Sequence, residues 1–583
     1  MKLKYFLSLS LFFLLLSFSF SEATIRYVSK SGTSQPPYTS WQTAADSIQK
    51  CINICSFGDT VYVANGVYKE TVVMIPGLSL IGSDWDSTVV DTRGLLQPGY
   101  PSIWFKDSCY LKGFNIIVSD ENLTGNGVYI SPSLVSTSGI IEQNNIFYGI
   151  DGILSGGGQV SVNSNLINFS AYGISMDDIN SSLIENNLII PTGVGINSGV
   201  GATPFIFNNI INLQNSNSTG IDCIFSYGTR INNNLIISNN SNKGIETYAW
   251  DTLTNNNVYG YFSYAGILSY GRDFTVNNSI TNGNVGYRKY SGSTDTPYFK
   301  YNNVWGNNQN YINYSPDTTN ISYDPMYVNT DSMDFHLQMF SPLIDAGDPN
   351  MLDKDGSRSD IGLYGGPFGV SYKYLDLAPS PPLNLTALDD SNYITLNWNR
   401  NTEADTSFYK VYRDTVINFT IDSTKLISSS TDTFLVQINP HNVTKYVYKV
   451  TCVDNQANES KPSEEKVVII TGIENYPQLI TDYQLYQNYP NPFNPTTTIS
   501  YRLKERSYVK LRVYDINGEL VNVLVNQVQV SGYYEVTFSM NNNDNSRSAV
   551  QNLASGIYLY KIDVISENNI PVYSQVKKML LLK

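Results

Sequence analysis

Histidine, cysteine and charge are all scarce in this chain of 583 residues. It holds two histidines, His336 and His441, and five cysteines, and charged residues make up 15% of it. The 36 lysines and arginines are outnumbered by 50 acidic residues, which gives a formal net charge of -14. A general nucleic-acid-binding protein needs clustered cationic side chains to neutralise phosphate, so this balance argues against that class. The length predicts several domains, because a single hydrophobic core stops growing at roughly 250 to 300 residues.

The cysteines match no zinc-binding pattern. They are Cys51, Cys55, Cys109, Cys223 and Cys452. Because their number is odd, at least one thiol stays free or pairs with another chain. Buried, unbonded thiols are the expected state for most of them. A disulfide from Cys51 or Cys55 to Cys109 stays open as an alternative.

The one long apolar run lies at the N-terminus. Lys2 and Lys4 precede the run from Leu7 to Phe20, and Ser21-Glu22-Ala23 offers small residues at the cleavage positions. This order predicts that residues 1–23 are a signal peptide, which is removed on export. A short membrane anchor is the alternative, although the run falls short of the ~20 residues that a spanning helix needs. We expect no transmembrane span in the mature chain.

Asparagine is abundant in the middle of the chain, where charge is rarest. Between Gly139 and Asn313, 33 of 175 residues are asparagine and only 16 are charged. The asparagines recur at steps of 20, 22, 22, 24, 23, 22 and 25 residues along the series Asn145, Asn165, Asn187, Asn209, Asn233, Asn256, Asn278 and Asn303. A Gly-Ile step recurs with a similar period at Gly149-Ile150, Gly173-Ile174, Gly195-Ile196, Gly220-Ile221, Gly244-Ile245 and Gly266-Ile267.

A fixed period of this length predicts a stacked solenoid. One unit holds two or three short strands and cannot bury its aliphatic residues alone. When units coil, each strand pairs in parallel with its equivalent about 4.8 Å away, and the aliphatic side chains form one column. Asparagine tolerates left-handed turns, and its amide can bond to the equivalent asparagine above and below. The asparagines are therefore interpreted as architecture, with ligand binding as the alternative.

The repeat resembles the right-handed parallel β-helix of the pectate-lyase-like superfamily, over residues 24–375. Before it, Trp41–Ile54 is typical of an amphipathic capping helix, and Gly58–Val63 with Gly66–Tyr68 is similar to the first coil of many secreted members. The predicted fold class is all-β: a right-handed parallel β-helix solenoid followed by two β-sandwich domains. The resemblance implies the fold and not one activity, because one fold hosts many functions.

A polar segment follows the last coil. It contains Ser341–Asp348 and then the spacing D-x-D-G-S from Asp353. It is similar to the closing element of surface-anchored β-helix proteins. Its alternating oxygens make Asp353, Asp355 and Asp360 candidate calcium ligands, although the bidentate glutamate of an EF-hand loop is absent. A hydrogen-bonded Asx turn that closes the core is the alternative.

Two further modules complete the chain. Residues 376–472 contain Ile394–Trp398, Tyr409–Arg413 and Tyr446–Val450, and resemble a fibronectin type III sandwich with Trp398 as its core tryptophan and Tyr446 as its tyrosine corner. Such a module implies a spacer or a weak binding unit.

Residues 473–583 resemble the type A C-terminal sorting domain of the type IX secretion system. The motifs that carry this resemblance are Tyr486–Thr497, Val513–Gly518, Leu553–Tyr560 and Lys577–Lys583. It implies the type IX secretion machinery as a partner, and a protein that is secreted or held at the outer-membrane surface of a Gram-negative bacterium. A plain immunoglobulin-like module is the alternative.

The coils lack the histidine motifs of several known enzymes on this fold. No histidine lies in the coils, so the Gly-His-Gly of polygalacturonases, the Asp-Pro-His of alginate epimerases and the Trp-x-Asp-His of pectate lyases are missing. Some lyases on this fold use only Lys, Arg and acidic residues, so catalysis stays open.

Alignment of the coils on the Gly-Ile step predicts one exposed face, because alternate strand residues point outward. The first outward position has Asp222, Glu246, Leu268 and Arg288; the third has Ile224, Tyr248, Tyr270 and Tyr290; the fifth has Ser226, Trp250, Arg272 and Gly292. Sugars stack on aromatic rings, so Tyr248, Trp250, Tyr270 and Tyr290 are candidate polysaccharide-binding residues.

Asp222, Glu246, Arg272 and Arg288 are the catalytic candidates on that face. The two carboxylates are expected about 5 Å apart, which suits retaining glycoside hydrolysis or cation binding. The alternatives are a tyrosine ladder that only stabilises the sheet, and two solvated carboxylates. Two functions therefore remain: a non-catalytic surface protein that contacts polysaccharide, and a polysaccharide lyase or glycosidase.

Overall fold

The structure is a computed structural model that describes residues 23–582, apart from residues 120–124, 132–137, 170, 178–180, 391–392, 439–444, 471–481, 540–552 and 567–568. The predicted signal peptide lies outside the described residues, except for Ala23. The chain forms two compact units: Met1–Ser322 with Leu343–Tyr372, and Tyr323–Pro342 with Lys373–Lys583. In the described part of the chain, no helix is long and apolar enough to cross a membrane.

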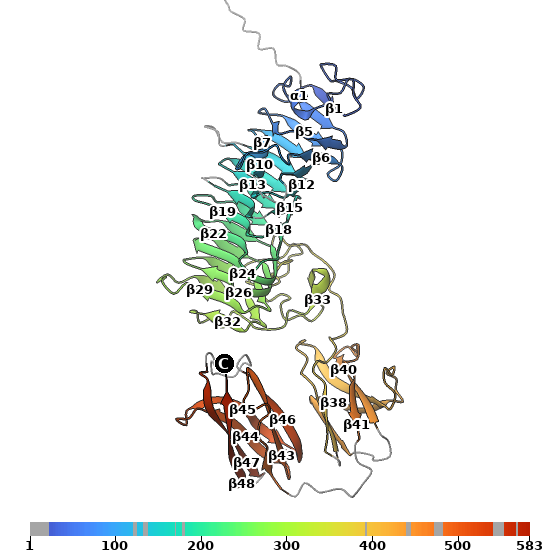
Figure 1. The fold of residues 1–583 in the computed structure, drawn as a ribbon, viewed down its shortest axis with the longest axis vertical. Coiled ribbons are helices and arrows are strands. Elements are labelled where there is room, and N and C mark those ends of the chain that lie inside the picture. Colours follow the sequence, from blue (N-terminus) through green and yellow to red (C-terminus); the bar gives the residue numbers. More distant parts are fainter. Residues whose placement is uncertain are drawn as a thin grey trace, which may run out of the picture. The chain divides into compact units, whose positions relative to one another are not determined.

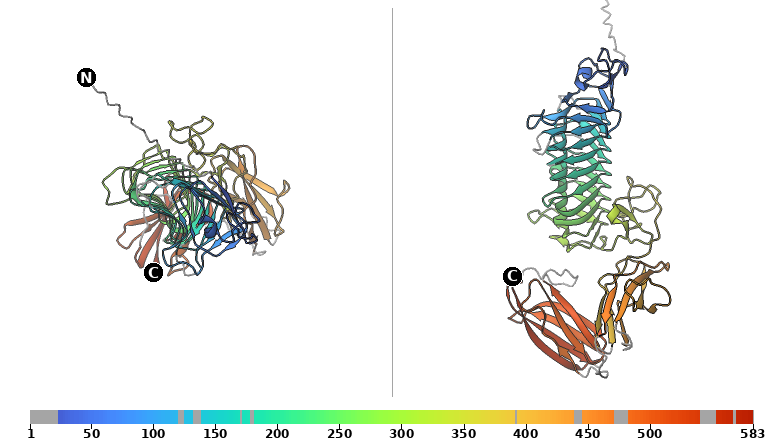
Figure 2. Two further views of the ribbon diagram at one scale, coloured as in Figure 1. Left: turned by 90° about the horizontal axis from the view of Figure 1, so that it is seen from above. Right: turned by 45° about the vertical axis from the view of Figure 1, so that its right-hand side comes forward.

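The first unit is a solenoid of three parallel strand ladders, stacked coil upon coil as Figure 1 and Figure 2 show. The first ladder consists of β1 (Ile25–Val28), β2 (Thr60–Val63), β5 (Ser79–Gly82), β8 (Cys109–Lys112), β11 (Ser138–Glu142), β14 (Gln159–Asn163), β17 (Leu183–Glu185), β20 (Phe205–Phe207), β23 (Arg230–Asn232), β25 (Thr252–Thr254), β27 (Phe274–Val276) and β30 (Tyr298–Lys300).

The second and third ladders share two long strands, β24 (Leu235–Ala249) and β26 (Asn257–Ser269). The other strands of the second ladder are β3 (Gly66–Tyr68), β6 (Thr88–Asp91), β9 (Asn115–Ile117), β12 (Asn145–Phe147), β15 (Leu166–Phe169), β18 (Leu188–Pro191), β21 (Ile210–Leu213), β28 (Ser279–Thr281) and β31 (Asn303–Trp305). Those of the third are β4 (Val72–Val73), β7 (Pro101–Phe105), β10 (Asn126–Ile130), β13 (Asp151–Ser155), β16 (Tyr172–Met176), β19 (Val194–Ser198), β22 (Thr219–Tyr227), β29 (Val285–Lys289) and β32 (Gln309–Ile312).

Each ladder sends one unbroken column of apolar side chains into the core. Ile153, Ile174, Ile196, Ile221, Ile245 and Ile267 follow one another in register in the third ladder, and all are fully buried. A buried side chain of this size contributes about 1.5–3 kcal/mol relative to an exposed one. The predicted fold class, a parallel β-solenoid followed by β-sandwich domains, is confirmed.

A column of glycines lies at the corner beside these isoleucines. A Cβ on Gly173 would come within 2.6 Å of the carbonyl oxygen of Gly195, so only glycine fits where successive coils approach this closely. The predicted series is wrong at one member, because Gly152-Ile153, and not Gly149-Ile150, takes this place in its coil.

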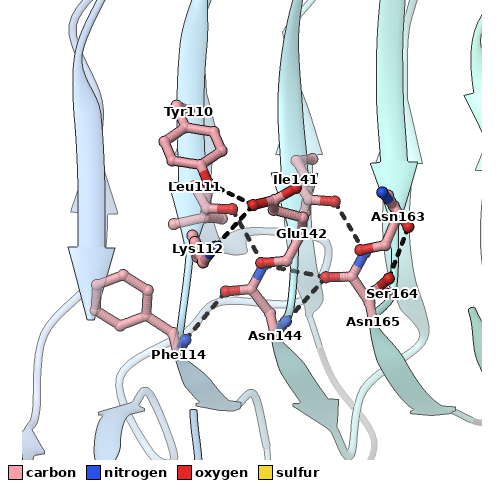
Figure 3. Close-up of polar contacts among 10 residues, drawn as sticks. All are labelled: Tyr110, Leu111, Lys112, Phe114, Ile141, Glu142, Asn144, Asn163, Ser164 and Asn165. Carbon is pink, nitrogen blue, oxygen red and sulfur yellow. Dashed lines mark hydrogen bonds and ion pairs between the residues drawn. The ribbon is translucent and has the colours of Figure 1, made fainter. Parts of the chain in front are cut away.

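Buried asparagines form a ladder at the corner between the first and second strand ladders, part of which Figure 3 shows. Each amide donates to the Oδ1 of the next asparagine, as Asn165 does to Asn187 at 3.0 Å, and also to backbone carbonyls. The ladder runs through Asn144, Asn165, Asn187, Asn209, Asn234, Asn256, Asn278, Asn302 and Asn320. Three predicted members, Asn145, Asn233 and Asn303, are wrong by one position, because only one residue of each run turns inward.

The residue before each ladder asparagine from Asn144 to Asn302 adopts a left-handed backbone, with φ between 52° and 59° at Asn186, Asn208, Asn233, Asn255 and Asn277. At the last three of these, the side chain turns outward and binds the segment Leu343–Gly366, which we call the strap. Asn233 Nδ2 donates to the carbonyl oxygens of Leu363 and Gly365 at 2.7 Å. The Asp348 N–H donates to Asn277 Oδ1 at 2.7 Å.

The first coil is capped by α1 (Ile48–Ile52), which is the one α-helix among the described residues. It is shorter than the predicted helix Trp41–Ile54, which is wrong over residues 41–47 and 53–54. Ser47 is the N-cap, and the Glu70 carboxylate accepts the N–H groups of Ile48 at 2.9 Å and Gln49 at 2.8 Å. These bonds fix the helix start at residue 48.

The second unit contains the two β-sandwich domains. The first sandwich has β35 (Thr386–Asp389), β36 (Tyr393–Asn397) and β39 (Phe434–Ile438) in one sheet, and β38 (Leu426–Ser430), β37 (Thr406–Asp414), β40 (Lys445–Asp454) and β41 (Lys466–Ile469) in the other. Trp398, 4% exposed, and Tyr446, 6% exposed, lie in its core. A short hairpin of β33 (Tyr327–Asn329) and β34 (Asp334–Leu337), with the 3-10 helix η1 (Thr330–Ser332) at its turn, also belongs to this unit.

The second sandwich has β42 (Gln484–Leu485), β43 (Thr496–Leu503) and β46 (Gly532–Ser539) in one sheet, and β45 (Leu520–Gln529), β44 (Ser507–Tyr514), β47 (Gly556–Ser566) and β48 (Pro571–Leu581) in the other. The loop before β43 docks on the last strand, because the Phe493 N–H donates to the Leu580 carbonyl at 2.9 Å. Asn488 in this loop is buried and donates through its backbone N–H to the Tyr560 hydroxyl at 2.9 Å.

The Asn209→Ala substitution tests the ladder. Asn209 donates to Ile184 O, Phe207 O and Asn234 Oδ1, and its own Oδ1 accepts from Asn187. A buried polar group that is left unpaired costs about 1–3 kcal/mol, so we expect the solenoid's free energy of unfolding to fall by about 2–4 kcal/mol, measured by denaturation followed with circular dichroism. Asn208→Gly, which keeps the left-handed backbone, should change it by less than about 1 kcal/mol. Equal losses in the two variants would contradict a structural role of the ladder.

Candidate functional site

Four tyrosines form an exposed column where the third strand ladder ends. Tyr227, Tyr248, Tyr270 and Tyr290 come from β22, β24 and the turns after β26 and β29. Their ring centroids are 5.5, 6.3 and 4.4 Å apart in that order. The backbone holds the column, because the Tyr290 N–H donates to Ser269 O at 2.8 Å and the Tyr270 N–H to Thr247 O at 3.1 Å. We call these tyrosines, with Trp250 and Arg272, the tyrosine face.

The first member of the column corrects the sequence alignment. Ile224 was predicted at this position, but the register of β22 shifts between Cys223 and Tyr227, so Tyr227 pairs with Ala249. Ser226 lies in the bulge, is fully buried and donates to Cys223 O at 3.0 Å, so it does not align with Trp250. A bulge adds residues to one strand, and counting along the sequence does not reveal it.

The tyrosine rings pack on one another more than they face solvent. Tyr270 and Tyr290 are stacked, with an angle of 24° between their rings. The facing sides of these two rings are therefore occupied. Trp250 is 60% exposed, against 55% for Tyr227, 39% for Tyr248 and 40% for Tyr290. Trp250 therefore has the largest exposed fraction of the aromatic residues on this face, and an exposed aromatic ring is what a sugar ring stacks on.

A shallow depression lies over the tyrosine column, and Trp250 and Arg272 are not among the residues that line it. It has a volume of about 330 Å³ and is lined by Tyr248, Tyr270, Tyr290 and Asp295, among others. The Arg272 guanidinium lies 5.4 Å from the Trp250 ring centroid, and its Nε donates to Asp295 Oδ1 at 2.9 Å. An aromatic ring next to a fixed cation and carboxylate is an arrangement that can hold a sugar and orient its hydroxyls.

A buried carboxylate holds the turn that presents Trp250. Trp250 has a left-handed backbone with φ 63°, a conformation that costs a bulky residue about 1–2 kcal/mol. Asp251 is fully buried directly after it and accepts the N–H groups of Thr229 at 2.8 Å, Gly228 at 3.1 Å and Tyr248 at 3.2 Å. Asp251 therefore fixes Tyr248 and Trp250 together.

The next coil also has a buried aspartate at the equivalent position. Asp273 is 1% exposed and its Oδ2 accepts the hydroxyls of Thr247 at 2.7 Å and Ser269 at 2.5 Å. Burial, together with the charge of Asp273, raises the pKa of Asp251 to about 7, and burial raises the pKa of Asp273 as well. Sequence reasoning missed this pair. The sequence feature that could have revealed it is an aspartate directly before β25 and another directly before β27, at equivalent places in two coils.

Two of the catalytic candidates are neighbours, as predicted, but they do not form an open pair. Asp222 and Glu246 are partners in register between β22 and β24. Glu246 is only 2% exposed and forms an ion pair with Lys243. Burial, followed by the nearby Glu246, raises the pKa of Tyr270 to about 12. The prediction that Glu246 lies on the exposed face is therefore wrong.

The cause is the length of β24 and β26. Because these strands run on through the turn between the second and third ladders, they bring Lys243 and Tyr264 next to the outward side chains of the third ladder. Arg288, another catalytic candidate, lies 4.2 Å from the centroid of the Tyr264 ring and donates to Tyr264 O at 3.1 Å. Of the eight predicted residues, the structure brings Tyr248, Trp250, Tyr270, Tyr290 and Arg272 together on the tyrosine face.

The three predicted calcium ligands are engaged with the backbone of the strap. Asp353 accepts the N–H groups of Asp360 and Gly366, Asp355 accepts that of Ser357 at 2.9 Å, and Asp360 accepts that of Asp345 at 2.9 Å. Over the described ranges, no group of three or more acidic, histidine or cysteine side chains is arranged to hold a metal ion. The bond of Asp355 is that of the alternative, an Asx turn, whereas those of Asp353 and Asp360 join residues farther apart in the strap. The calcium site stays a prediction.

All five cysteines are free thiols. Cys51, Cys109, Cys223 and Cys452 are buried, which is the state expected for most of them, and Cys55 is partly exposed. The alternative disulfide to Cys109 is not formed.

Residues 487–571 match the family described as the secretion system C-terminal sorting domain. This match lies within the second sandwich and supports the predicted type IX sorting domain, so the chain carries a signal for secretion. No curated protein matches the chain.

Several solved structures are similar to parts of the chain. XylC in complex with xylose is 10% identical over 76% of this chain and 100% of that one, with a TM-score of 0.36. A pectin methylesterase from Aspergillus niger is 12% identical over 50% of this chain and 91% of that one, with a TM-score of 0.25. An Fn3-like protein from Clostridium thermocellum is 30% identical over 17% of this chain and 99% of that one, with a TM-score of 0.14. At these TM-scores the likenesses carry no argument about activity.

The raised pKa of Asp251 predicts a pH dependence of stability. The pKa of about 7 in the folded protein lies above the usual 3.8, so folding favours the protonated acid. The resulting stability is fully present below about pH 4 and is lost as pH rises through about 7, at up to ~1.4 kcal/mol per pH unit. Asp251→Asn should flatten the fall in unfolding temperature between pH 5 and 8. Asp355→Asn, on an exposed turn of the strap, should leave it unchanged. The same slope in Asp251→Asn and wild type would contradict this assignment.

Proposed function

We propose that this chain is a secreted or cell-surface β-helix protein that binds polysaccharide through the tyrosine face. The observation that carries the proposal is the state of Trp250. Its ring is 60% exposed although its backbone is held in a strained left-handed conformation, and a buried aspartate supports the turn. Strain that supports an exposed aromatic ring, with Arg272 and Asp295 beside it, is typical of a binding surface.

The proposed route to the cell surface has two steps. Residues 1–23 act as a signal peptide for the inner membrane, and the C-terminal domain is then recognised by the type IX machinery in the outer membrane of a Gram-negative cell. The match of residues 487–571 to a secretion sorting domain supports the second step. In this proposal, residues 376–472 are a fibronectin type III-like module that serves as a spacer. The buried Trp398 in its core supports this assignment.

The second candidate function is a polysaccharide lyase or glycosidase that acts on the same face. The register that places Asp222 beside Glu246 favours it, and burial together with Glu246 raises the pKa of Asp222. Against it, Glu246 is buried and neutralised by Lys243. A nucleophile or base must reach the substrate, so binding without turnover is the preferred function.

Binding is tested with the full-length protein on an array of neutral and uronate polysaccharides, followed by calorimetry on those that bind. Trp250→Ala and Tyr248→Ala should each weaken binding at least ~10-fold, because they remove about 1.4 kcal/mol or more of ring contact. Tyr298→Ala is the matched control, since Tyr298 is a 41% exposed tyrosine that stacks on Phe274 on another face of the same coils. An equal loss in all three variants, or no binding by wild type, would overturn the proposal.

Turnover is measured on the same polysaccharides from reducing ends and from the ultraviolet absorbance of unsaturated products. We expect none. Activity that disappears in Glu246→Gln while binding persists would establish the enzyme function instead, because that substitution removes the carboxylate charge and keeps the shape of the side chain.

A further inference from the structure

A second depression lies at a different corner of the solenoid, near its N-terminal end. It has a volume of about 420 Å³ and is lined by Gly82, Ser83, Asp84, Trp85, Lys112, Gly113, Gln143 and Ser164. This size is within the range of small-molecule sites, about 300–1,000 Å³. The lining residues come from the turns after β5, β8, β11 and β14, between the first and second ladders, whereas the tyrosine face lies where the third ladder ends.

The floor of this depression exists because two successive coils have glycine at the turn. Gly113 has φ 80° and occupies the left-handed position that Gln143, Ser164 and Asn186 fill in the following coils. A Cβ on Gly82 would lie 2.1 Å from Gly113 O, so the two backbones are in direct contact. Glycine at both positions is what allows the two coils to approach this closely beside the hollow.

Trp85 forms one wall of the hollow, and a residue from another coil holds its loop in place. Its loop follows β5 and is held by Asn145, whose Nδ2 donates to Asp86 Oδ1 at 2.8 Å and to Trp85 O at 3.4 Å from a coil further along the solenoid. The Trp85 ring is nevertheless 40% exposed. A large aromatic residue on a pinned loop, left exposed at the edge of a hollow, is a preformed stacking surface.

Lys112, which lines the hollow, belongs to a preorganised polar cluster that Figure 3 shows. Glu142 Oε1 accepts both the Lys112 ammonium at 3.0 Å and the Tyr110 hydroxyl. Burial alone would raise the pKa of Glu142, but the bonds from Tyr110 and Lys112 bring it below its usual value. The carboxylate is therefore ionised and fixed, and Gln143 beside it is exposed. Fixed donors and acceptors of this kind suit the vicinal hydroxyls of a sugar.

Charge selects among sugars. Lys112 is neutralised by Glu142, and the loop of Trp85 adds Asp84 and Asp86, so the surroundings of the hollow are net negative. A uronate would meet repulsion here, whereas a neutral sugar would not. We propose that this hollow is a second carbohydrate-binding site, and that it takes a neutral hexose unit stacked on Trp85 and hydrogen-bonded to Lys112 and Gln143, with Glu142 holding Lys112 in place.

Calorimetry on the full-length protein tests this with cellohexaose, mannohexaose and hexagalacturonate as probes. At least one neutral hexasaccharide should bind, and Trp85→Ala should weaken its binding at least tenfold. Trp85→Phe, which keeps an aromatic ring, should retain most of it. Gln143→Ala should weaken it severalfold. Hexagalacturonate should bind this site at least tenfold more weakly than the best neutral probe.

Trp250→Ala is the matched control, because it removes a tryptophan from the tyrosine face and leaves this hollow intact. The binding that Trp85→Ala removes should persist in Trp250→Ala. The proposal for this hollow and the proposal for the tyrosine face are therefore tested independently of each other. The proposal is overturned if neither neutral probe binds at millimolar concentration, if Trp85→Ala binds as wild type does, or if hexagalacturonate binds more tightly through Trp85. Circular dichroism of Trp85→Ala should match wild type, since Trp85 is exposed.

Discussion

The hydrogen bond between asparagine side chains one coil apart is the interaction on which the solenoid depends. A stack of short strands has to turn a tight corner in every coil, and each corner buries backbone groups that need partners. One asparagine per coil supplies them: its Oδ1 accepts the N–H of the preceding ladder asparagine, and its Nδ2 bonds to carbonyls and to the next amide. Part of the high asparagine content of the middle of the chain follows from this corner.

The same corner also determines where surface chemistry is placed. The outward asparagines Asn233, Asn255 and Asn277 bind the strap, so this side of the later coils is covered. In the early coils, Gly82 and Gly113 stand at this corner, where their backbones touch and line a hollow. The tyrosine face lies at a different corner, where buried Asp251 accepts backbone N–H groups and buried Asp273 accepts hydroxyl groups. One repeated architecture thus yields a covered corner, a hollow and an aromatic face.

The fold and the approximate site could be predicted from the sequence, but the register of the strands and of the asparagine ladder could not. The period of the asparagines predicts stacked coils, while which member of each pair turns inward depends on the left-handed residue before it, so Asn145 was taken for Asn144. Because of the bulge at Ser226, alignment along the sequence assigned Ile224 to the position that Tyr227 occupies in the structure. The burial of Glu246 depends on strands that continue past a turn, and the role of Asp251 depends on three backbone contacts. Neither leaves a periodic pattern in the sequence.

The central claim is that polysaccharide binds at Trp250. Hydroxyl-radical footprinting, read by mass spectrometry, measures the exposure of individual side chains in the full-length protein with and without a polysaccharide that binds it. The oxidation rate of Trp250 should fall severalfold on binding, with smaller falls at Tyr248 and Tyr290, while that of Tyr298 stays constant. An unchanged oxidation rate at Trp250 in a saturated complex would contradict the claim.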